Sequence, residues 1–359
     1  MKRSHKLGLT ALGMAGAASV LALVAIAAPT PTPSKAPLAG TRVDNFMLAD
    51  QTGMGHELYY FKEKAAVVIV TAAEGDVVSD RAKAALAKVQ DAFKGKNVHF
   101  VMLDSSLNSK HDKFDGTPGS ATLPVLADEL QLIGRSLGVT QTGEAFVINP
   151  KSWTVAYHGP IADSFADKKV GKAPSVTEVA VKGTAVDFPD RAKASTFANI
   201  SYSTEVAPVL ADKCVVCHTQ GGMAPFAMDK YEVVKAMAPM IREALRTKRM
   251  PPYHSDRHGS VWTDDMRPTD AQVKTMINWI EAGAPRGTGA DPLPDAAKPA
   301  PKWPMGEPDL VLQVPAFDVP ASGIVDYQDR SIPSKFTEGK WLKATAYANA
   351  TPTVHHALA

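Results

Sequence analysis

Two cysteines and a histidine form the group of residues in this sequence that is best suited to chemistry. The chain has 359 residues and only two cysteines, both within Cys214-Val215-Val216-Cys217-His218. Two thiols one helical turn apart can add to the two vinyl groups at one porphyrin edge, and the next imidazole can then bind the iron. The spacing therefore predicts one covalently bound c-type haem, with His218 as the proximal iron ligand.

Three other interpretations of this string remain open. A zinc site needs four ligands, and His254 and His258 could join the two cysteines. A dithiol redox site uses the same spacing but needs a thioredoxin-like βαβ context, and these cysteines lie outside the segment with that pattern. A string this short can also match by chance. A disulfide scaffold is excluded, because two cysteines make at most one bridge.

Met250 is the expected distal iron ligand. A thioether opposite an imidazole raises the reduction potential and suits electron transfer. Met250 follows a helix predicted from Asp229 to about Lys248, and the two prolines after it end that helix and fix an extended turn. His254 or an open position are alternatives, and an open position would indicate ligand sensing or peroxidase-like chemistry. The other candidate methionines, several of them typical of helix cores, are Met223, Met228, Met237, Met240 and Met266.

Helices on both sides of the cysteines are expected to position these ligands. Ser203 or Thr204 can cap a helix that runs into Cys214. Thr269-Asp270 can cap a later helix that ends at Gly283. The apolar stripe of the later helix consists of Val273, Met276, Ile277 and Ile280.

Residues 201–287 resemble a small class I-like cytochrome c domain. The resemblance rests on the cysteine-histidine motif, on Arg249-Met250-Pro251-Pro252-Tyr253, and on a C-terminal helix that ends in Trp279-Ile280-Glu281-Ala282-Gly283-Ala284-Pro285. It implies an all-α domain, with His218 and Met250 on opposite sides of the haem iron, that transfers electrons.

The N-terminus predicts export. Residues 1–6 are basic and residues 7–28 are apolar with small residues near the end, which is typical of a secretory signal peptide over residues 1–28. An uncleaved anchor is the alternative, because the apolar run is close to spanning length. The expected location is the periplasm of a Gram-negative bacterium, with membrane contact only through an uncleaved signal. Attachment of c-type haem also takes place outside the cytoplasm.

Composition favours a soluble chain of several domains. It is 45% hydrophobic and 21% charged, and its net charge of +2 gives no basic field for nucleic acid. We expect an α/β domain over residues 37–183, a charged connector with little regular structure over 184–200, and a helical domain over 201–287. A Pro/Ala-rich linker is expected over 288–304, and an incomplete β domain over 305–359.

The first domain alternates strand-like and helix-like segments. Ala66 to Val70 is typical of a strand buried on both faces. Ser79-Asp80 is a good N-cap pair for a helix that ends at Gly95. Val98 to Leu103 predicts a second strand, and further strands are predicted at Pro124–Leu126, Ala145–Ile148 and Thr154–Tyr157. This order predicts a βαβ start to a mixed sheet.

The segment from about residue 40 to residue 165 resembles the redoxin branch of the thioredoxin fold. The resemblance rests on Leu123–Asp128, Phe146–Pro150 and Tyr157-His158-Gly159. That family has a redox cysteine in the loop that here reads Thr71 to Ser79, and a cis-proline where this chain has Thr142-Gly143. Without a thiolate there is no nucleophile for disulfide exchange. We therefore expect a catalytically silent docking or scaffolding module, or a simple spacer.

The last region reads as short strands that end in His355-His356. Strand-like segments are Asp326-Tyr327-Gln328 and Lys340 to Ala344. Neighbouring residues on a strand face opposite ways, which favours an exposed histidine pair without a ligand role. Residues 306–359, however, resemble the start of the copper type II, ascorbate-dependent monooxygenases, and this resemblance implies that His355 and His356 contribute to a copper site.

The chain contains only the start of such a domain. We therefore expect no catalytic residue and no monooxygenase activity in it as it stands, and poor order where strands lack partners. The predicted function is electron transfer to an unidentified periplasmic redox protein, as a carrier or as the delivery arm of a larger oxidase. The alternative is the haem-bearing fragment of a copper monooxygenase. A thiol oxidoreductase is disfavoured by the absent cysteine and cis-proline.

Overall fold

The computed structural model describes residues 38–109, 115–161, 177–178, 181–252, 262–263, 265–298, 303 and 305–347. Several sequence predictions fall outside the described residues, namely those on the signal segment 1–28, His254, His258, His355 and His356. Within the described ranges, no helix is long and apolar enough to cross a membrane.

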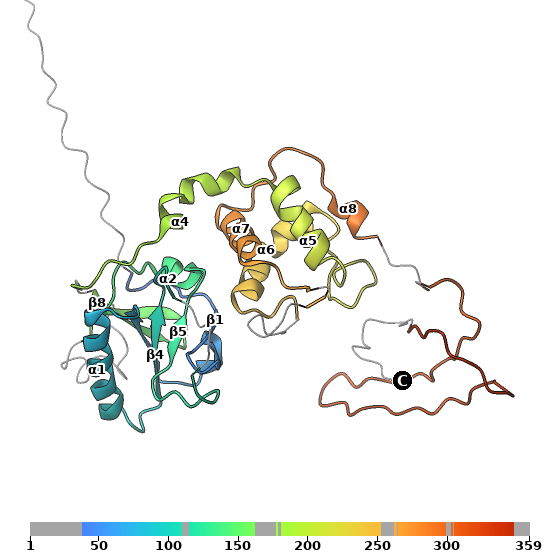
Figure 1. The fold of residues 1–359 in the computed structure, drawn as a ribbon, viewed down its shortest axis with the longest axis horizontal. Helices are drawn as coiled ribbons and strands as arrows, with labels where there is room; N and C mark the ends of the chain where they lie inside the picture. The colour runs from blue at the N-terminus through green and yellow to red at the C-terminus, as the bar shows by residue number, and fades with distance from the viewer. Residues whose placement is uncertain are drawn as a thin grey trace, which may run out of the picture. The chain divides into compact units, whose positions relative to one another are not determined.

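A mixed sheet forms the centre of the first domain (Figure 1). In the described residues it has six strands in the order β5-β4-β3-β6-β7-β8. The strands are β3 (Ala66–Ala72), β4 (Val98–Asp104), β5 (Val125–Ala127), β6 (Glu144–Asn149), β7 (Thr154–Pro160) and β8 (Thr177–Glu178). β3, β4 and β5 run parallel, whereas β6 pairs antiparallel with both β3 and β7. The predicted βαβ start to a mixed sheet is confirmed.

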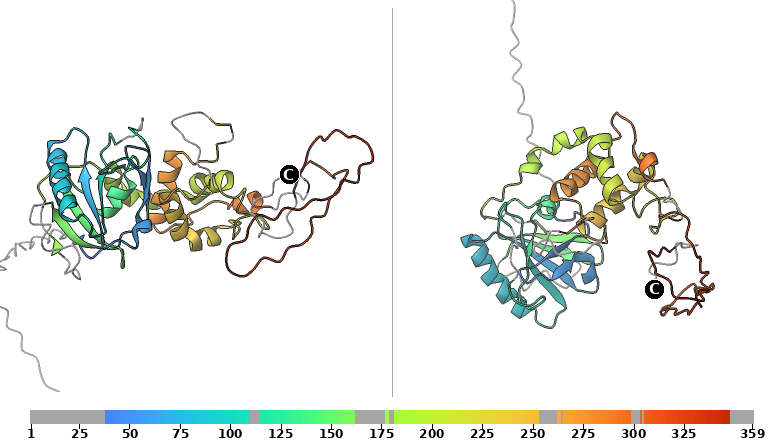
Figure 2. Two further views of the ribbon diagram at one scale, coloured as in Figure 1. Left: turned by 90° about the horizontal axis from the view of Figure 1, so that it is seen from below. Right: turned by 45° about the vertical axis from the view of Figure 1, so that its right-hand side comes forward.

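Both faces of the sheet are covered, which explains the continuous apolar run of β3. Alternate residues of a strand point to opposite faces. Val68 and Val70 pack with Leu86 of α1 (Val77–Ala92), which lies along one face of the sheet (Figure 2). Val67 and Ile69 belong to the cluster on the other face, which contains Leu132 of α2 (Leu132–Leu137).

This topology is that of a thioredoxin-like fold. A parallel β3-α1-β4 unit is followed by the antiparallel β6-β7 pair, with β3 between β4 and β6. A small hairpin of β1 (Met47–Ala49) and β2 (Gly55–Glu57) precedes the sheet, and the 3₁₀ turn η1 (Leu58–Phe61) follows the hairpin. The expected thioredoxin-like α/β domain is therefore present.

The connector after the sheet has more structure than its sequence indicated. It contains α4 (Pro189–Ala192) and the 3₁₀ turn η2 (Ala194–Asn199). Phe188 and Phe197 are buried, and the guanidinium groups of Arg191 and Arg135 lie over their respective rings. These two aromatic anchors hold a segment that we expected to be irregular.

The described residues of 201–298 are helical. The elements are η3 (Tyr202–Val206), α5 (Ala207–Lys213), α6 (Tyr231–Arg246), α7 (Asp270–Glu281) and α8 (Leu293–Ala296). Tyr202 and Trp279 are almost fully buried, with stacked rings 5.7 Å apart. The Trp279 indole donates to the Pro285 carbonyl at 2.9 Å, and the Tyr231 hydroxyl donates to the Ala284 carbonyl at 2.7 Å. These bonds fix the turn after α7.

The first helical cap differs from the sequence prediction. Ser201, rather than Ser203 or Thr204, is the N-cap, and its hydroxyl accepts from the Thr204 amide. The later helix begins as predicted, because Thr269 and Gln272 form a reciprocal capping box. The local sequence pattern thus located both helices. It predicted the wrong N-cap residue for the first of them, because several neighbouring side chains could serve as a cap.

The predicted linker over 288–304 is partly folded. Asp291 accepts hydrogen bonds from the Tyr202 hydroxyl at 3.0 Å and from the Tyr231 amide at 2.7 Å. Leu293 is fully buried, and the Thr219 hydroxyl donates to the Ala297 carbonyl. The helical region therefore continues to about residue 297, past the boundary of 287 that the sequence indicated.

Residues 305–347 contain no strand or helix, so the predicted strands of a partial β domain are absent from the described part of this region (Figure 1). A strand needs a neighbour to satisfy its backbone groups and cover its apolar side chains. Neither is provided here, and thirteen large apolar side chains of this segment are exposed: Met305, Val311, Leu312, Val314, Phe317, Val319, Ile324, Val325, Tyr327, Phe336, Trp341, Leu342 and Tyr347.

Candidate haem-attachment site

The two cysteines lie one helical turn apart, directly after α5. The His218 amide donates to the Cys214 carbonyl at 2.9 Å and the Cys217 amide does so at 3.2 Å, so the chain makes one more turn beyond the helix. Buried Val209, Leu210 and Val215 anchor this turn to the core. Both cysteines are free and partly buried. The geometry matches the spacing that attachment to two vinyl groups requires.

His218 is held in one orientation. Its side chain is buried, with the residue only 7% exposed, and its Nδ1 lies 3.0 Å from the carbonyl oxygen of Phe226. Because a carbonyl only accepts, Nδ1 must carry the proton, which leaves the lone pair on Nε2. Histidines that bind metals typically donate the other ring N–H in this way. The hydrogen bond therefore leaves Nε2 of His218 as the ring nitrogen that could bind a metal ion.

The loop between His218 and Phe226 is pinned by the backbone. The Met228 amide donates to the His218 carbonyl at 2.7 Å, and the Ala224 amide donates to the Cys217 carbonyl at 3.2 Å. The rings of His218 and Phe226 lie 4.6 Å apart. The acceptor of the imidazole proton is thus fixed relative to the cysteine turn. Sequence reasoning did not identify Phe226, because a backbone acceptor leaves no trace in residue type.

The protonation of these side chains follows from burial. Burial raises the pKa of the Cys214 thiol to about 12, with Cys217 and Asp212 adding to the effect. Burial also lowers the pKa of His218, against the hydrogen bond to Phe226. The site therefore presents a thiol and a neutral imidazole near neutral pH. Disulfide exchange needs a thiolate, for which this environment is unfavourable.

Met250 lies on an exposed turn beyond α6. Lys248 has a left-handed φ of 55°, and the Arg249 amide donates to the Ala244 carbonyl at 3.0 Å, so the chain turns sharply off the helix end. Met250 is 45% exposed, whereas Met228, another of the candidate methionines, is buried in the core. Among the described contacts, none joins Met250 to the cysteines or to His218, so its role as ligand stays a prediction.

The described helical region has exposed apolar side chains that a haem could cover, whereas the zinc alternative through His254 and His258 falls outside the described residues. Val216, Met223, Met240 and Met250 are large apolar side chains left exposed in the helical region. Exposed apolar groups of this kind suit an apolar macrocycle that covers them. In the part of the chain that the structure describes, no group of three or more His, Cys, Asp or Glu side chains could hold a metal ion.

The loop that carries the redox cysteine in redoxins is closed by an oxygen network here. Asp76, not Ser79, is the N-cap of α1, and it accepts from the Ser79 amide and hydroxyl, both at 2.8 Å. The hydroxyls of Thr142 and Thr184 also donate to Asp76, at 2.8 and 2.6 Å. Thr142, which stands where redoxins have a cis-proline, thus supplies one of these hydroxyls. This network joins three segments and contains no nucleophilic sulfur.

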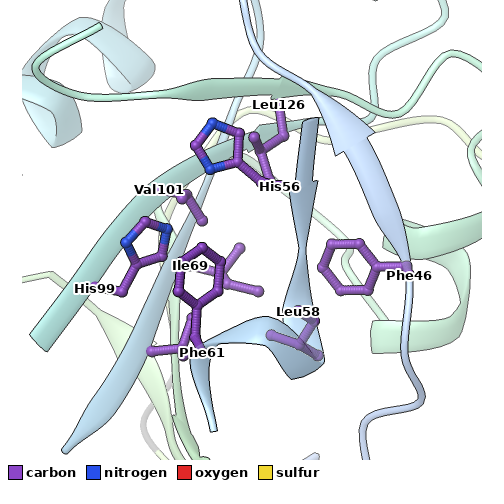
Figure 3. Close-up of a pocket in the computed structure, with 9 residues that line it drawn as sticks. Phe46, His56, Leu58, Phe61, Ile69, His99, Val101 and Leu126 are labelled. Atoms are coloured by element: carbon purple, nitrogen blue, oxygen red, sulfur yellow. The ribbon is translucent and has the colours of Figure 1, made fainter. Parts of the chain in front are cut away.

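A small pocket in the sheet domain is filled by packing (Figure 3). His56, Phe61 and His99 stack there, with the Phe61 and His99 rings 3.7 Å apart. Asp50 lies 2.9 Å from Nε2 of His56. Burial, with His56 and Lys64 nearby, lowers the pKa of His99 to about 4. The remaining volume of about 10 Å³ has room for roughly one water molecule, which excludes an organic substrate.

Comparison with known proteins gives structural likeness but no family. No family model and no curated protein matches the chain. A hypothetical protein from Sinorhizobium meliloti is similar over 41% of this chain and 93% of its own, at 21% identity and a TM-score of 0.34. The peroxidoxin BcpB of Mycobacterium tuberculosis is similar over 36% of this chain and 92% of its own, at 19% identity and a TM-score of 0.29.

A third similar structure is the thioredoxin domain of a thiol-disulfide oxidoreductase from Bacteroides vulgatus. It shares 15% identity over 36% of this chain and 93% of its own, at a TM-score of 0.30. Likeness at this level carries no functional argument. The thioredoxin-like assignment rests on the strand order described above.

Replacing Asp76 with Ala should destabilise the sheet domain by about 0.5–2 kcal/mol near pH 7, the usual cost of a lost N-cap. Burial alone would raise the pKa of Asp76, but hydrogen bonds from Thr184, Ser79 and Thr142 outweigh it and hold that pKa well below 3.8. The stabilisation is therefore present above pH 3.8 and is lost as the pH falls through the lowered pKa. Urea unfolding at several pH values measures it.

Asp91→Ala, an exposed position near the end of the same helix, is the matched control and should change the free energy of unfolding little at any pH. Equal unfolding curves for the wild type and Asp76→Ala near neutral pH would contradict the role given to Asp76.

Proposed function

We propose that this chain is a periplasmic electron-transfer protein that carries one covalent haem. Cys214 and Cys217 would each add a thiol across one vinyl group, which forms two thioethers and needs no oxidant. The observation that carries the proposal is the buried His218, which directly follows two thiols one helical turn apart. Its Nδ1 is hydrogen-bonded to the Phe226 carbonyl.

Each residue around the motif has a defined task in this proposal. The bound haem would supply a one-electron redox centre. The Phe226 carbonyl orients the His218 imidazole and increases its basicity as a ligand. The buried turn of Val209, Leu210 and Val215 holds the cysteines and keeps water from one side of the site. Met250 would help to hold the haem iron, and its thioether would favour a high reduction potential.

The sheet domain is proposed to be a scaffold. Thiol–disulfide chemistry would need a thiolate in this domain, but both cysteines of the chain lie in the helical region. The network of Asp76, Thr142 and Thr184 occupies the loops that would otherwise carry a redox cysteine and cis-proline. This arrangement supports a binding or positioning role.

Location and partner follow from the same proposal. The signal-like residues 1–28 would direct the chain to the periplasm, and the partner would be another periplasmic redox protein. Contact with the membrane would occur only through an uncleaved signal. The net charge of +2 gives no reason to propose a nucleic acid as partner.

A second candidate function is favoured by the exposed apolar side chains of residues 305–347. They would suit a chain whose β domain is completed by further sequence, so that the haem region delivers electrons to a copper monooxygenase. In that case His355 and His356 would contribute to a copper site. Reading the gene beyond Ala359 tests this candidate, and a frame that lacks further histidine and methionine ligands contradicts it.

Replacing both Cys214 and Cys217 with Ala should abolish covalent haem. The full chain is produced in a cell that attaches c-type haem, and the purified protein is stained for haem on a denaturing gel and converted to its pyridine haemochrome. The wild type should keep one haem through acidic acetone, and the double variant should keep none. Val216→Ala, at the exposed position between the cysteines, is the control and should keep its haem. A colourless wild type overturns the proposal.

Replacing Met250 with Ala should remove the thioether-to-iron charge-transfer band and lower the midpoint potential, because a harder ligand or none replaces the thioether. Met223→Ala and Met240→Ala remove thioethers that are exposed to a similar degree and should leave the band in place. The absorbance spectrum of the oxidised protein decides the outcome. Survival of the band in Met250→Ala means that another residue is the distal ligand.

A further inference from the structure

The sheet domain contacts the C-terminal end of α6 through a charged cluster. Asp44 accepts from Nη2 of Arg242 at 2.5 Å and lies 3.9 Å from Nη1 of Arg246. The Ser136 hydroxyl, at the end of α2, accepts from Nη2 of Arg246 at 3.0 Å. The side-chain amide of Asn45 donates to the Glu243 carboxylate at 3.4 Å. Three α6 residues from its last two turns are thus held by the sheet domain.

Arg246 is the most deeply buried charged group of this contact, so its pairing partners matter most. Its side chain is only 2% exposed, and its Nε has no hydrogen-bond partner. A buried guanidinium is costly unless its remaining donors are paired, and here those donors reach Ser136 and Asp44. Moving the end of α6 away from the sheet domain would break these pairs. The helix end is therefore fixed in place.

The same cluster continues to the residue before Met250. Glu243 accepts from Nη2 of Arg249 at 2.6 Å, and Nε of Arg249 donates to the Thr247 hydroxyl at 3.0 Å. The Arg249 amide is bonded to the Ala244 carbonyl. Both the side chain and the backbone of Arg249 are thus tied to α6, and Met250 is the next residue.

We propose that the sheet domain acts as a positioning element for Met250, with Asp44 as the principal positioning residue. This inference rests on the proposed function, because it assumes that Met250 binds the haem iron. An axial thioether must be held within a fraction of an ångström of its binding geometry. The order of contacts runs from Asp44 and Asn45 through the end of α6 to Arg249 and Met250. It assigns a task to a thioredoxin-like domain without redox cysteines.

A second set of contacts, which holds α7 instead of α6, provides a matched control. Arg135 of α2 donates to Asn278 at 2.6 Å and to Glu281 at 2.9 Å, and Lys274 lies 2.7 Å from Asp190. These partners lie on α7, which does not lead to Met250. Loss of a contact on α7 should weaken the interface without moving the thioether.

The test uses Asp44→Asn in the full haem-loaded chain, with Lys274→Gln as the control, because Lys274 of α7 pairs with Asp190 and not with the Asp44 cluster. Asp44→Asn should weaken the charge-transfer band, lower the midpoint potential, and speed the oxidation of Met250 by peroxide about two- to fivefold, the range expected from one partly exposed ion pair. Mass spectrometry reports sulfoxide at Met250 against Met240 in the same molecule. Lys274→Gln should match the wild type in all three measurements.

Arg242→Gln removes the other partner of the Asp44–Arg242 pair. If one of the two variants fails to fold, the other still tests the inference. The double variant should show less than the sum of the two single effects, because the pair is lost only once. Unchanged band, potential and Met250 oxidation in both single variants, with haem attached, overturn the inference and leave the proposed function standing. A wild type with haem but no charge-transfer band overturns the assignment of Met250 and this inference with it, while absent haem overturns the proposed function.

Discussion

The hydrogen bond from Nδ1 of His218 to the Phe226 carbonyl is the interaction on which the proposed site depends. It fixes the tautomer, leaves the lone pair on Nε2, and ties the imidazole to a loop that is itself hydrogen-bonded back to Cys217 and His218. A neutral imidazole at 7% exposure is stable only with its proton satisfied. The cysteine turn and this loop therefore form one preorganised unit, which α5 and the buried Val215 attach to the helical core.

The thioredoxin-like domain keeps its architecture although its sequence contains no cysteine. Its sheet is stabilised by apolar packing on both faces, which does not depend on a redox cysteine. At the N-terminus of α1, the Asp76 carboxylate accepts hydrogen bonds from the hydroxyls of Ser79, Thr142 and Thr184, which come from three segments of the domain. Such a network stabilises the loop but provides no nucleophile. The charged contacts of Asp44 with α6 are then the most informative feature of the domain.

Several elements could be predicted from the sequence because their signals are local. The apolar run of β3, the helical periodicity of α1 and α7, and the capping box at Thr269 each lie within a few residues. Caps were misplaced by two or three residues, at Asp76 and Ser201, because several neighbouring side chains could serve. The folding of residues 288–297 was missed, since Asp291 and Leu293 act through partners up to 89 residues away. The Phe226 carbonyl that accepts from His218 and the Asp44–Arg242 pair, which spans 198 residues, produce no periodic pattern in the sequence. They could therefore not be predicted from it.

The most direct measurement is the mass of one tryptic peptide. Trypsin cleaves after Lys213 and Lys230, and no Lys or Arg lies between them, so the whole motif is released as Cys214–Lys230. From protein made in a cell that attaches c-type haem, this peptide should carry the added mass of one haem with both thiols consumed. Recovery of the peptide at its unmodified mass, with two thiols that still react with an alkylating reagent, would contradict the account.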